Sequence, residues 1–120
     1  MRTYLSPANE EETDHSKICI REEFFDAIVS GYVSEMNCEL TNEEKKYFVY
    51  AGKFMIYMQA LRFLTDYLNN DRYYGARYEH HNLDRAKNQI VLLQRLFEKE
   101  EVLNRIAEEH LSVVIPHIQL

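Results

Sequence analysis

One stretch of this sequence, Arg62 to Asn88, gathers side chains that could recognise a hydroxylated ligand. Arg62 interrupts the most apolar segment of the chain, and a guanidinium is costly to bury unless it is paired. An ion pair with Asp66, four residues further on, is the simple interpretation. The functional interpretation is that Arg62 leaves the core and presents its planar donors to a ligand. Tyr73 and Tyr74 follow, and rings beside such donors suit a polyhydroxylated molecule.

Other chemical patterns are weak or missing. His80 and His81 are adjacent, so their side chains diverge, and we expect one to pack under the loop and the other to cap a helix rather than share a metal ion. No serine lies in a G-x-S-x-G motif, and the three glycines are too scattered for a phosphate loop. Acidic runs at 10–14 and 98–109 indicate solvated surfaces. We therefore expect no catalytic residue, metal site or cofactor in this chain.

Hydrophobic periodicity predicts the helices that must position these residues. A helix over about 20–36 is indicated by one apolar face, formed by Phe25, Ile28, Val29, Tyr32, Val33 and Met36. Thr41 and Glu44 have the spacing of a capping box and predict the start of a second helix, over about 42–68. That helix is apolar nearly all round, so we expect it to be central. Asn69-Asn70-Asp71 is a turn sequence that ends it.

A third helix is predicted over about 82–109, with Asn82 as a candidate N-cap. Its expected inner stripe is Ala86, Ile90, Leu93, Leu96 and Phe97. We expect a single domain within 1–120: an irregular acidic leader (1–19), a helical core (20–110) and an apolar tail (111–120). The tail could be a strap across the helices or a contact to another chain.

Composition supports an all-α class. Only three Gly and two Pro occur in 120 residues, too few for the turns of an all-β chain. The net charge of −6 argues against nucleic acid as a partner. No membrane span or signal peptide is apparent, and the two cysteines, Cys19 and Cys38, fit no metal motif, so we expect a cytoplasmic protein. Whether they form a disulfide is a question that the sequence leaves open. The nine Tyr could line a ligand site, a partner interface or the edge of the core.

Two segments, RFLTDYLNNDRYY (62–74) and YEHHNLDRAKNQ (78–89), resemble the C-terminal end of aminoglycoside-phosphotransferase-like kinases that act on N-acetylhexosamines. The resemblance extends over essentially all of residues 1–106. It departs from the family at the turn, where the family has L-x-G-D and this chain has Asn70 in place of glycine; Asn can adopt the same backbone conformation. Family members are often labelled mucin-desulfating, but the C/S-x-P-x-R context of a sulfatase is absent here.

The resemblance implies that this chain is the helical C-terminal subdomain of a kinase-like C-lobe. The complete enzyme would use ATP and Mg²⁺ to phosphorylate the anomeric hydroxyl of a sugar such as N-acetylglucosamine or N-acetylgalactosamine. Arg62 and Tyr73 would contact the sugar, and Asp66 would orient Arg62. His81 and Asn82 would fix the loop that carries Tyr73, and Tyr74 would be a further supporting residue.

Phosphoryl transfer also needs a nucleotide-covering loop, a catalytic aspartate and a metal-binding acidic residue. In the family these precede the segment matched here, so we expect the chain to be inactive without the N-terminal kinase lobes. The alternative is a stand-alone helical interaction module that self-associates, as a homo-oligomer, through a surface that those lobes would cover.

Overall fold

The computed structural model describes residues 5–36 and 38–116, and these residues form helices without any strand. The elements follow in the order η1 (a 3-10 turn, His15–Lys17), α2 (Glu22–Met36), α3 (Asn42–Lys46), α4 (Phe48–Leu68), α5 (His81–Glu98) and α6 (Glu100–Leu111). The predicted all-α class is therefore confirmed. Within the described ranges, no helix has the length and apolar character needed to cross a bilayer.

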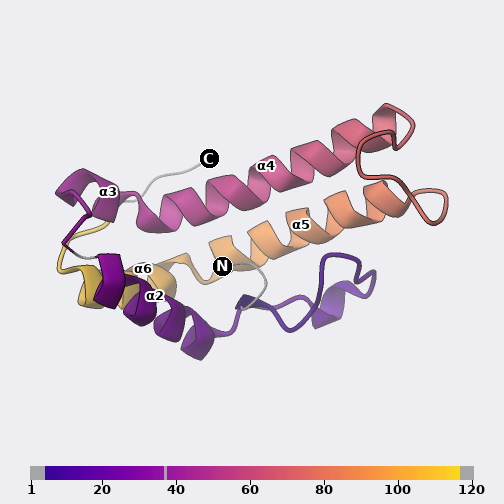
Figure 1. Cartoon of the computed structure of the whole chain (residues 1–120). Helices are drawn as coiled ribbons and strands as arrows, with labels where there is room; N and C mark the ends of the chain where they lie inside the picture. Colours follow the sequence, from indigo (N-terminus) through magenta and orange to yellow (C-terminus); the bar gives the residue numbers. More distant parts are fainter. Residues whose placement is uncertain (1–4, 37, 117–120) are drawn as a thin grey trace.

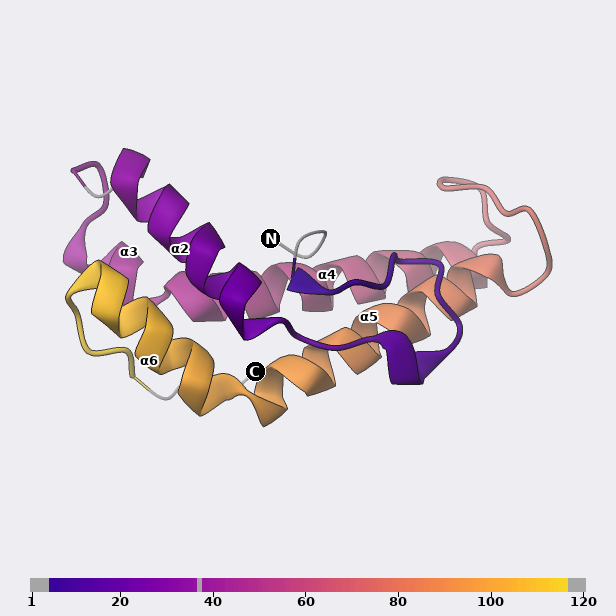
Figure 2. The same ribbon diagram turned by 90° about the horizontal axis from the view of Figure 1, so that it is seen from below.

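Two long helices, α4 and α5, lie side by side in opposite directions and form the body of the molecule (Figure 1). The loop 69–80 joins them at one end. At the other end, α6 turns away from α5 and packs against α2 (Figure 2). The leader lies along α5, held by hydrogen bonds from Asn88 to the carbonyls of Asn9 and Glu12 and from Arg95 to the carbonyl of Ile18.

Two of the predicted helices are each interrupted by one residue. The helix expected over 42–68 divides at Tyr47 into α3 and α4, and the helix expected over 82–109 divides at Lys99 into α5 and α6. Lys99 has φ −106° and ψ 12°, and its ammonium binds the carbonyl of Ile20 and the carboxylate of Glu22. The break at Lys99 changes the direction of the chain, so that α5 packs on α4 and α6 packs on α2.

The capping box predicted at Thr41 is present. The Thr41 hydroxyl accepts from the Glu44 amide at 3.1 Å, and the Glu44 carboxylate accepts from the Thr41 amide at 3.2 Å. These two bonds satisfy amide groups that the first turn of a helix leaves without partners. The prediction succeeded because a capping box is a local motif, complete within four residues.

The core includes both ends of the described chain as well as the helices. Leu5 and Ile18 of the leader are buried, as are Ile20 before α2 and Ile115 after α6. The apolar residues of the acidic leader thus belong to the same core cluster as the helices. Ile115 favours the strap interpretation for the described part of the tail; residues 117–120 lie outside the described residues. The remaining core is Phe25, Val29, Val49, Ile56, Leu92, Leu96, Leu103, Ala107 and Leu111.

The two long helices each differ from their predicted faces. On α5, Ile90 and Phe97 are exposed, and the buried positions are taken partly by polar residues, Asn82, Asn88 and Gln89. On α4, one face is buried, but the side away from it remains open and carries large apolar side chains: Phe54, Met55, Tyr57 and Leu61. Tyr47, just before α4, is exposed as well. The expectation of a fully surrounded α4 is therefore not met by the described residues.

Candidate functional site

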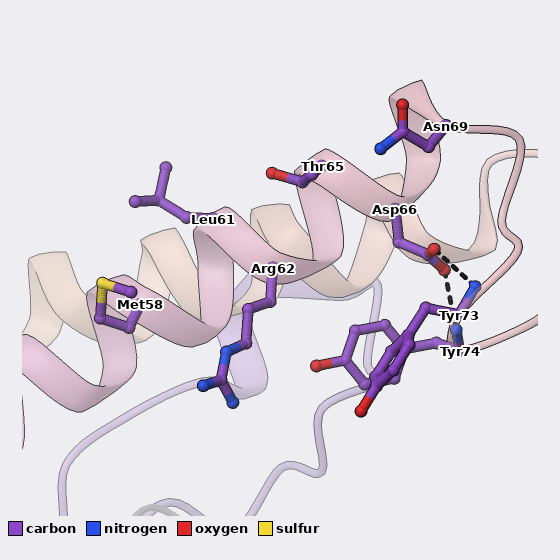
Figure 3. Close-up of a pocket in the computed structure, with 8 residues that line it drawn as sticks. All are labelled: Met58, Leu61, Arg62, Thr65, Asp66, Asn69, Tyr73 and Tyr74. Carbon is purple, nitrogen blue, oxygen red and sulfur yellow. Dashed lines mark hydrogen bonds between the residues drawn. The ribbon is translucent and has the colours of Figure 1, made fainter.

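The Asp66 carboxylate fixes the loop that follows α4. It accepts hydrogen bonds from the backbone amides of Tyr73 (2.8 Å) and Tyr74 (2.9 Å), and it is buried (Figure 3). The predicted pairing of Asp66 with Arg62 is wrong, because the Arg62 side chain points away from this carboxylate. A carboxylate at the C-terminal end of a helix also opposes the helix dipole. Its position is explained by the loop amides that it binds.

The turn between Asp66 and Tyr73 uses left-handed backbone conformations. Asn70 has φ 64°, Asp71 has φ 59° and Gly75 has φ 71°. The Asp71 amide donates to the Asp66 carbonyl at 2.7 Å, which closes the turn on the end of α4. Asn70 thus adopts the conformation for which glycine is favoured, as expected from its place in the L-x-G-D pattern.

Asn82 joins three segments of the loop through one fully buried side chain. Its amide nitrogen lies 3.0 Å from Asp66 Oδ2, 2.9 Å from Asp71 Oδ1 and 3.0 Å from the Gly75 carbonyl. Arg85 donates to Asn82 Oδ1 at 2.9 Å, and this bond fixes which end of the amide faces the loop. The predicted role of Asn82 as N-cap is wrong, because α5 begins at His81 with His80 as its cap.

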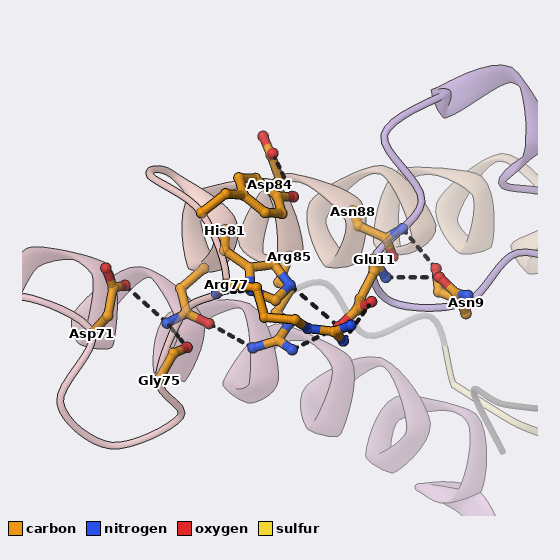
Figure 4. A network of polar contacts seen from close by, with 11 residues as sticks. Asn9, Glu11, Asp71, Gly75, Arg77, His81, Asp84, Arg85 and Asn88 are labelled. Carbon is orange, nitrogen blue, oxygen red and sulfur yellow. Dashed lines mark hydrogen bonds and ion pairs between the residues drawn. The ribbon is translucent and has the colours of Figure 1, made fainter.

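His81 lies under the same loop and connects it to the leader (Figure 4). Its Nδ1 accepts from the Arg77 amide at 3.2 Å, so the proton of the neutral ring resides on Nε2, which faces Glu11 Oε1 at 3.2 Å. The ring is buried and stacks on Tyr78 at a centroid distance of 4.6 Å. His81 is therefore committed to structural contacts.

Glu11 is the centre of this connection. Its carboxylate accepts from Arg85 at 2.7 Å and from Arg77 at 2.9 Å, in addition to the His81 ring. The hydrogen bond from Arg85, together with the positive charge of Arg77, lowers the pKa of Glu11 below its ordinary value of 4.5. Sequence reasoning missed this cluster, because Glu11 and Arg85 are 74 residues apart and no local pattern links them.

His80 does not join its neighbour in a metal site. Its Nδ1 lies 2.8 Å from the Tyr67 hydroxyl, while the His81 ring is occupied by Arg77 and Glu11. In the described part of the chain, no group of three or more His, Cys, Asp or Glu residues could hold a metal ion. Cys19 and Cys38 are both free and exposed, so the structure contains no disulfide between them.

Arg62 and Tyr73 line one hollow of about 520 Å³ beside the C-terminal half of α4 (Figure 3). Its other lining residues are Met58, Leu61, Thr65, Asp66, Asn69 and Tyr74. The exposed Arg62 side chain makes no hydrogen bond or ion pair with any residue that the structure describes. Its donors are available to a ligand.

The two tyrosines of the hollow have different roles. Tyr74 packs on the buried ring of Phe63, with 4.9 Å between centroids, and so anchors the loop to α4. Tyr73 is 84% exposed and touches Tyr74 edge-on. An aromatic ring, a guanidinium, the Thr65 hydroxyl and the Asn69 amide thus surround one hollow, which is the arrangement that a hydroxylated ligand requires.

A comparison of the chain with models of known protein families finds no match. The kinase relationship therefore stays a prediction from the two sequence segments, and the site must be judged by its geometry.

Proposed function

We propose that this chain supplies the sugar-binding surface of an ATP-dependent kinase that phosphorylates the anomeric hydroxyl of N-acetylhexosamines. The observation that carries the proposal is the shared hollow: the Arg62 guanidinium has no hydrogen-bond or ion-pair partner among the described residues, and it lies in the same lining as the exposed ring of Tyr73. These are the two positions for which the sequence resemblance implies sugar contact, and they come from segments separated by the turn at the end of α4.

In the proposed complex, Arg62 donates to the sugar hydroxyls or to the acetamide carbonyl, and the Tyr73 ring stacks on the apolar face of the sugar. Asp66 and Asn82 act as positioning residues, because they hold the backbone that carries Tyr73. His81 supports the same loop from below. The loop is thereby fixed before a ligand arrives, which lowers the entropic cost of binding.

Nucleotide chemistry is assigned to other parts of the parent protein. A kinase needs acidic ligands that hold Mg²⁺ against the ATP phosphates. Among the described residues, no group of three or more His, Cys, Asp or Glu side chains could hold a metal ion. In this proposal the helices belong to a kinase-like C-lobe, the protein acts in the cytoplasm, and the chain is not catalytic by itself.

Saturation-transfer NMR of the chain with N-acetylglucosamine and N-acetylgalactosamine tests this assignment. We expect weak binding with saturation of the ring protons, and a loss of signal in Arg62→Ala and Tyr73→Ala. Arg105→Ala is the matched control, since Arg105 is an exposed arginine on α6, away from the hollow. The proposal fails if wild-type chain binds neither sugar, or if both site variants bind as well as Arg105→Ala.

Self-association is a second candidate function, favoured by the open face of α4. Met55 is 63% exposed on this face, and Tyr57 is 41% exposed. Between Lys46 and Arg62 the helix has a single charged residue, Lys53, which is buried and paired with Glu100. An uncharged apolar surface of this kind favours association with a second copy.

Sedimentation equilibrium over a wide range of concentrations tests this second function. A monomer–dimer equilibrium that Met55→Glu or Tyr57→Glu shifts toward monomer would support it. A chain that stays monomeric at every concentration would exclude it. Leu61 lies both on this face and in the sugar hollow, so a dimer formed here should also dissociate when the sugar is added.

A further inference from the structure

A second hollow of about 350 Å³ adjoins the first around the same tyrosine. It is lined by Asp66, Leu68, Asn69, Asn70, Arg72 and Tyr73, and it shares Asp66, Asn69 and Tyr73 with the hollow beside Arg62. The exposed ring of Tyr73 therefore lies at the boundary between the two. A ligand that contacts this ring from the first hollow is therefore adjacent to the second.

The polar residues around the loop fall into two groups with different partners. The side chains of the first group, such as Asp66 and Asn82, make hydrogen bonds within the protein and hold the loop backbone in place. A second group lines the hollows, and the side chains of this group make no hydrogen bond or ion pair with any described residue: Arg62, Thr65, Asn69, Asn70 and Arg72. Donors and acceptors suitable for hydroxyl groups thus continue from one hollow into the next.

The backbone of the second hollow is held in a defined left-handed turn. Asn70 and Asp71 are consecutive residues with positive φ, a conformation that Gly, Asn and Asp adopt more readily than other residues. The turn is kept closed by the hydrogen bond from the Asp71 amide to the Asp66 carbonyl and by the hydrogen bond from Asn82 to the Asp71 carboxylate. Asn70 is thereby placed in the lining together with Asn69 and Arg72.

The hydrogen-bonding groups of the lining suit a hydroxylated ligand. Arg62 and Arg72 would each attract an anion, and the one carboxylate that borders both hollows, Asp66, already accepts hydrogen bonds from the loop. Amide groups supply both donors and acceptors, which match the mixed hydrogen bonding of sugar hydroxyls rather than a phosphate, which only accepts. The exposed Leu68 and Tyr73 add apolar surface for the C–H faces of a sugar.

We infer that the two hollows form one extended saccharide site, which binds a reducing disaccharide ending in N-acetylhexosamine. The reducing sugar occupies the hollow beside Arg62, the second sugar ring occupies the hollow beside Arg72, and Tyr73 contacts both. This inference rests on the proposed function, because that function places the anomeric sugar beside Arg62. Arg72 and Asn70 are then the residues that set selectivity for the longer ligand.

Saturation-transfer titrations compare N-acetylglucosamine with two disaccharides, N,N′-diacetylchitobiose and N-acetyllactosamine. We expect at least one disaccharide to bind roughly tenfold more tightly than the monosaccharide. Arg72→Ala and Asn70→Gly should reduce that affinity to the monosaccharide value and leave N-acetylglucosamine binding unchanged. Glycine at position 70 keeps the left-handed backbone while removing the amide, so the turn is preserved. Arg105→Ala should alter neither ligand.

The outcomes separate this inference from the function on which it rests. If N-acetylglucosamine binds but both disaccharides bind no better than it does, the second subsite is refuted and the sugar-binding function stands. If neither class of sugar binds, both proposals fail. Competition with inorganic phosphate is a further test. If phosphate displaces the disaccharide from the wild-type chain but does not do so from Arg72→Ala, the second hollow is an anion site and the inference is overturned.

Discussion

Replacing Asp66 by asparagine tests whether this side chain acts only as an acceptor. At present Oδ1 accepts from the Tyr73 amide, and Oδ2 accepts from the Tyr74 amide and the Asn82 side chain. All three partners are donors. Asparagine has nearly the same shape but one of its two polar ends is itself a donor, so at least one N–H group must face another N–H group.

The size of the change in the free energy of unfolding follows from these three hydrogen bonds. The best orientation of the new amide keeps its oxygen at the Oδ2 position, retains two weaker bonds and loses the bond to Tyr73. A hydrogen bond to a charged group contributes about 1.5–3 kcal/mol, and a neutral one about 1 kcal/mol. We therefore expect Asp66→Asn to lower the free energy of unfolding by about 3 kcal/mol, and Asp66→Ala to lower it by about 2 kcal/mol more, because the two remaining hydrogen bonds are lost as well.

Urea denaturation followed by circular dichroism measures the change, and amide hydrogen exchange locates it. Asp84→Asn is the matched control, because Asp84 accepts only the Tyr78 hydroxyl and should cost less than about 1 kcal/mol. Faster exchange at Tyr73 and Tyr74 is expected in Asp66→Asn alone. The reasoning is refuted if the two variants unfold at the same urea concentration and both amides exchange at the wild-type rate.

Three further predictions concern pH, backbone conformation and thiols. Because the pKa of Glu11 is lowered, its contacts stabilise the fold fully above pH about 4.5 and are lost as the pH falls through the lower folded pKa. Below pH about 4.5, wild type should therefore lose urea resistance more steeply than Glu11→Gln. Asn70→Ala should lower the free energy of unfolding by about 1 kcal/mol while Asn70→Gly leaves it nearly unchanged, as chemical denaturation would measure. Cys19 and Cys38 should both react with a thiol reagent in the folded protein, and protection of either would contradict their exposed, unpaired state.

Features that depend on neighbouring residues could be predicted from the sequence. The capping box at Thr41 and the turn at Asn70 are examples, because each requires only a few consecutive residues in a defined conformation. The arrangement of Arg62 and Tyr73 around one hollow was also foreseeable, since Arg62 lies less than two turns before the end of α4 and Tyr73 lies in the turn that folds back after it.

Features that depend on distant segments could not be predicted. Asp66 was assigned to Arg62 because helical spacing is visible in a sequence, whereas a loop that folds back onto a carboxylate is not. The buried face of α5 was misplaced for a related reason. Asn88 is buried because its side chain donates hydrogen bonds to two carbonyls of the leader. Hydrophobic periodicity cannot identify such a residue, because its burial is stabilised by hydrogen bonds rather than by apolar packing.

The contact between Glu11 and Arg85 also has a consequence for the order of folding. It spans 74 residues, so it can form only after α4 and α5 have paired and the leader has been laid along them. We expect this contact between Glu11 and Arg85 to be absent from the folding transition state. Glu11→Gln should then accelerate unfolding and leave the refolding rate nearly unchanged. The leader around Glu11 would be among the last parts of the molecule to become rigid, and it would be among the first to loosen.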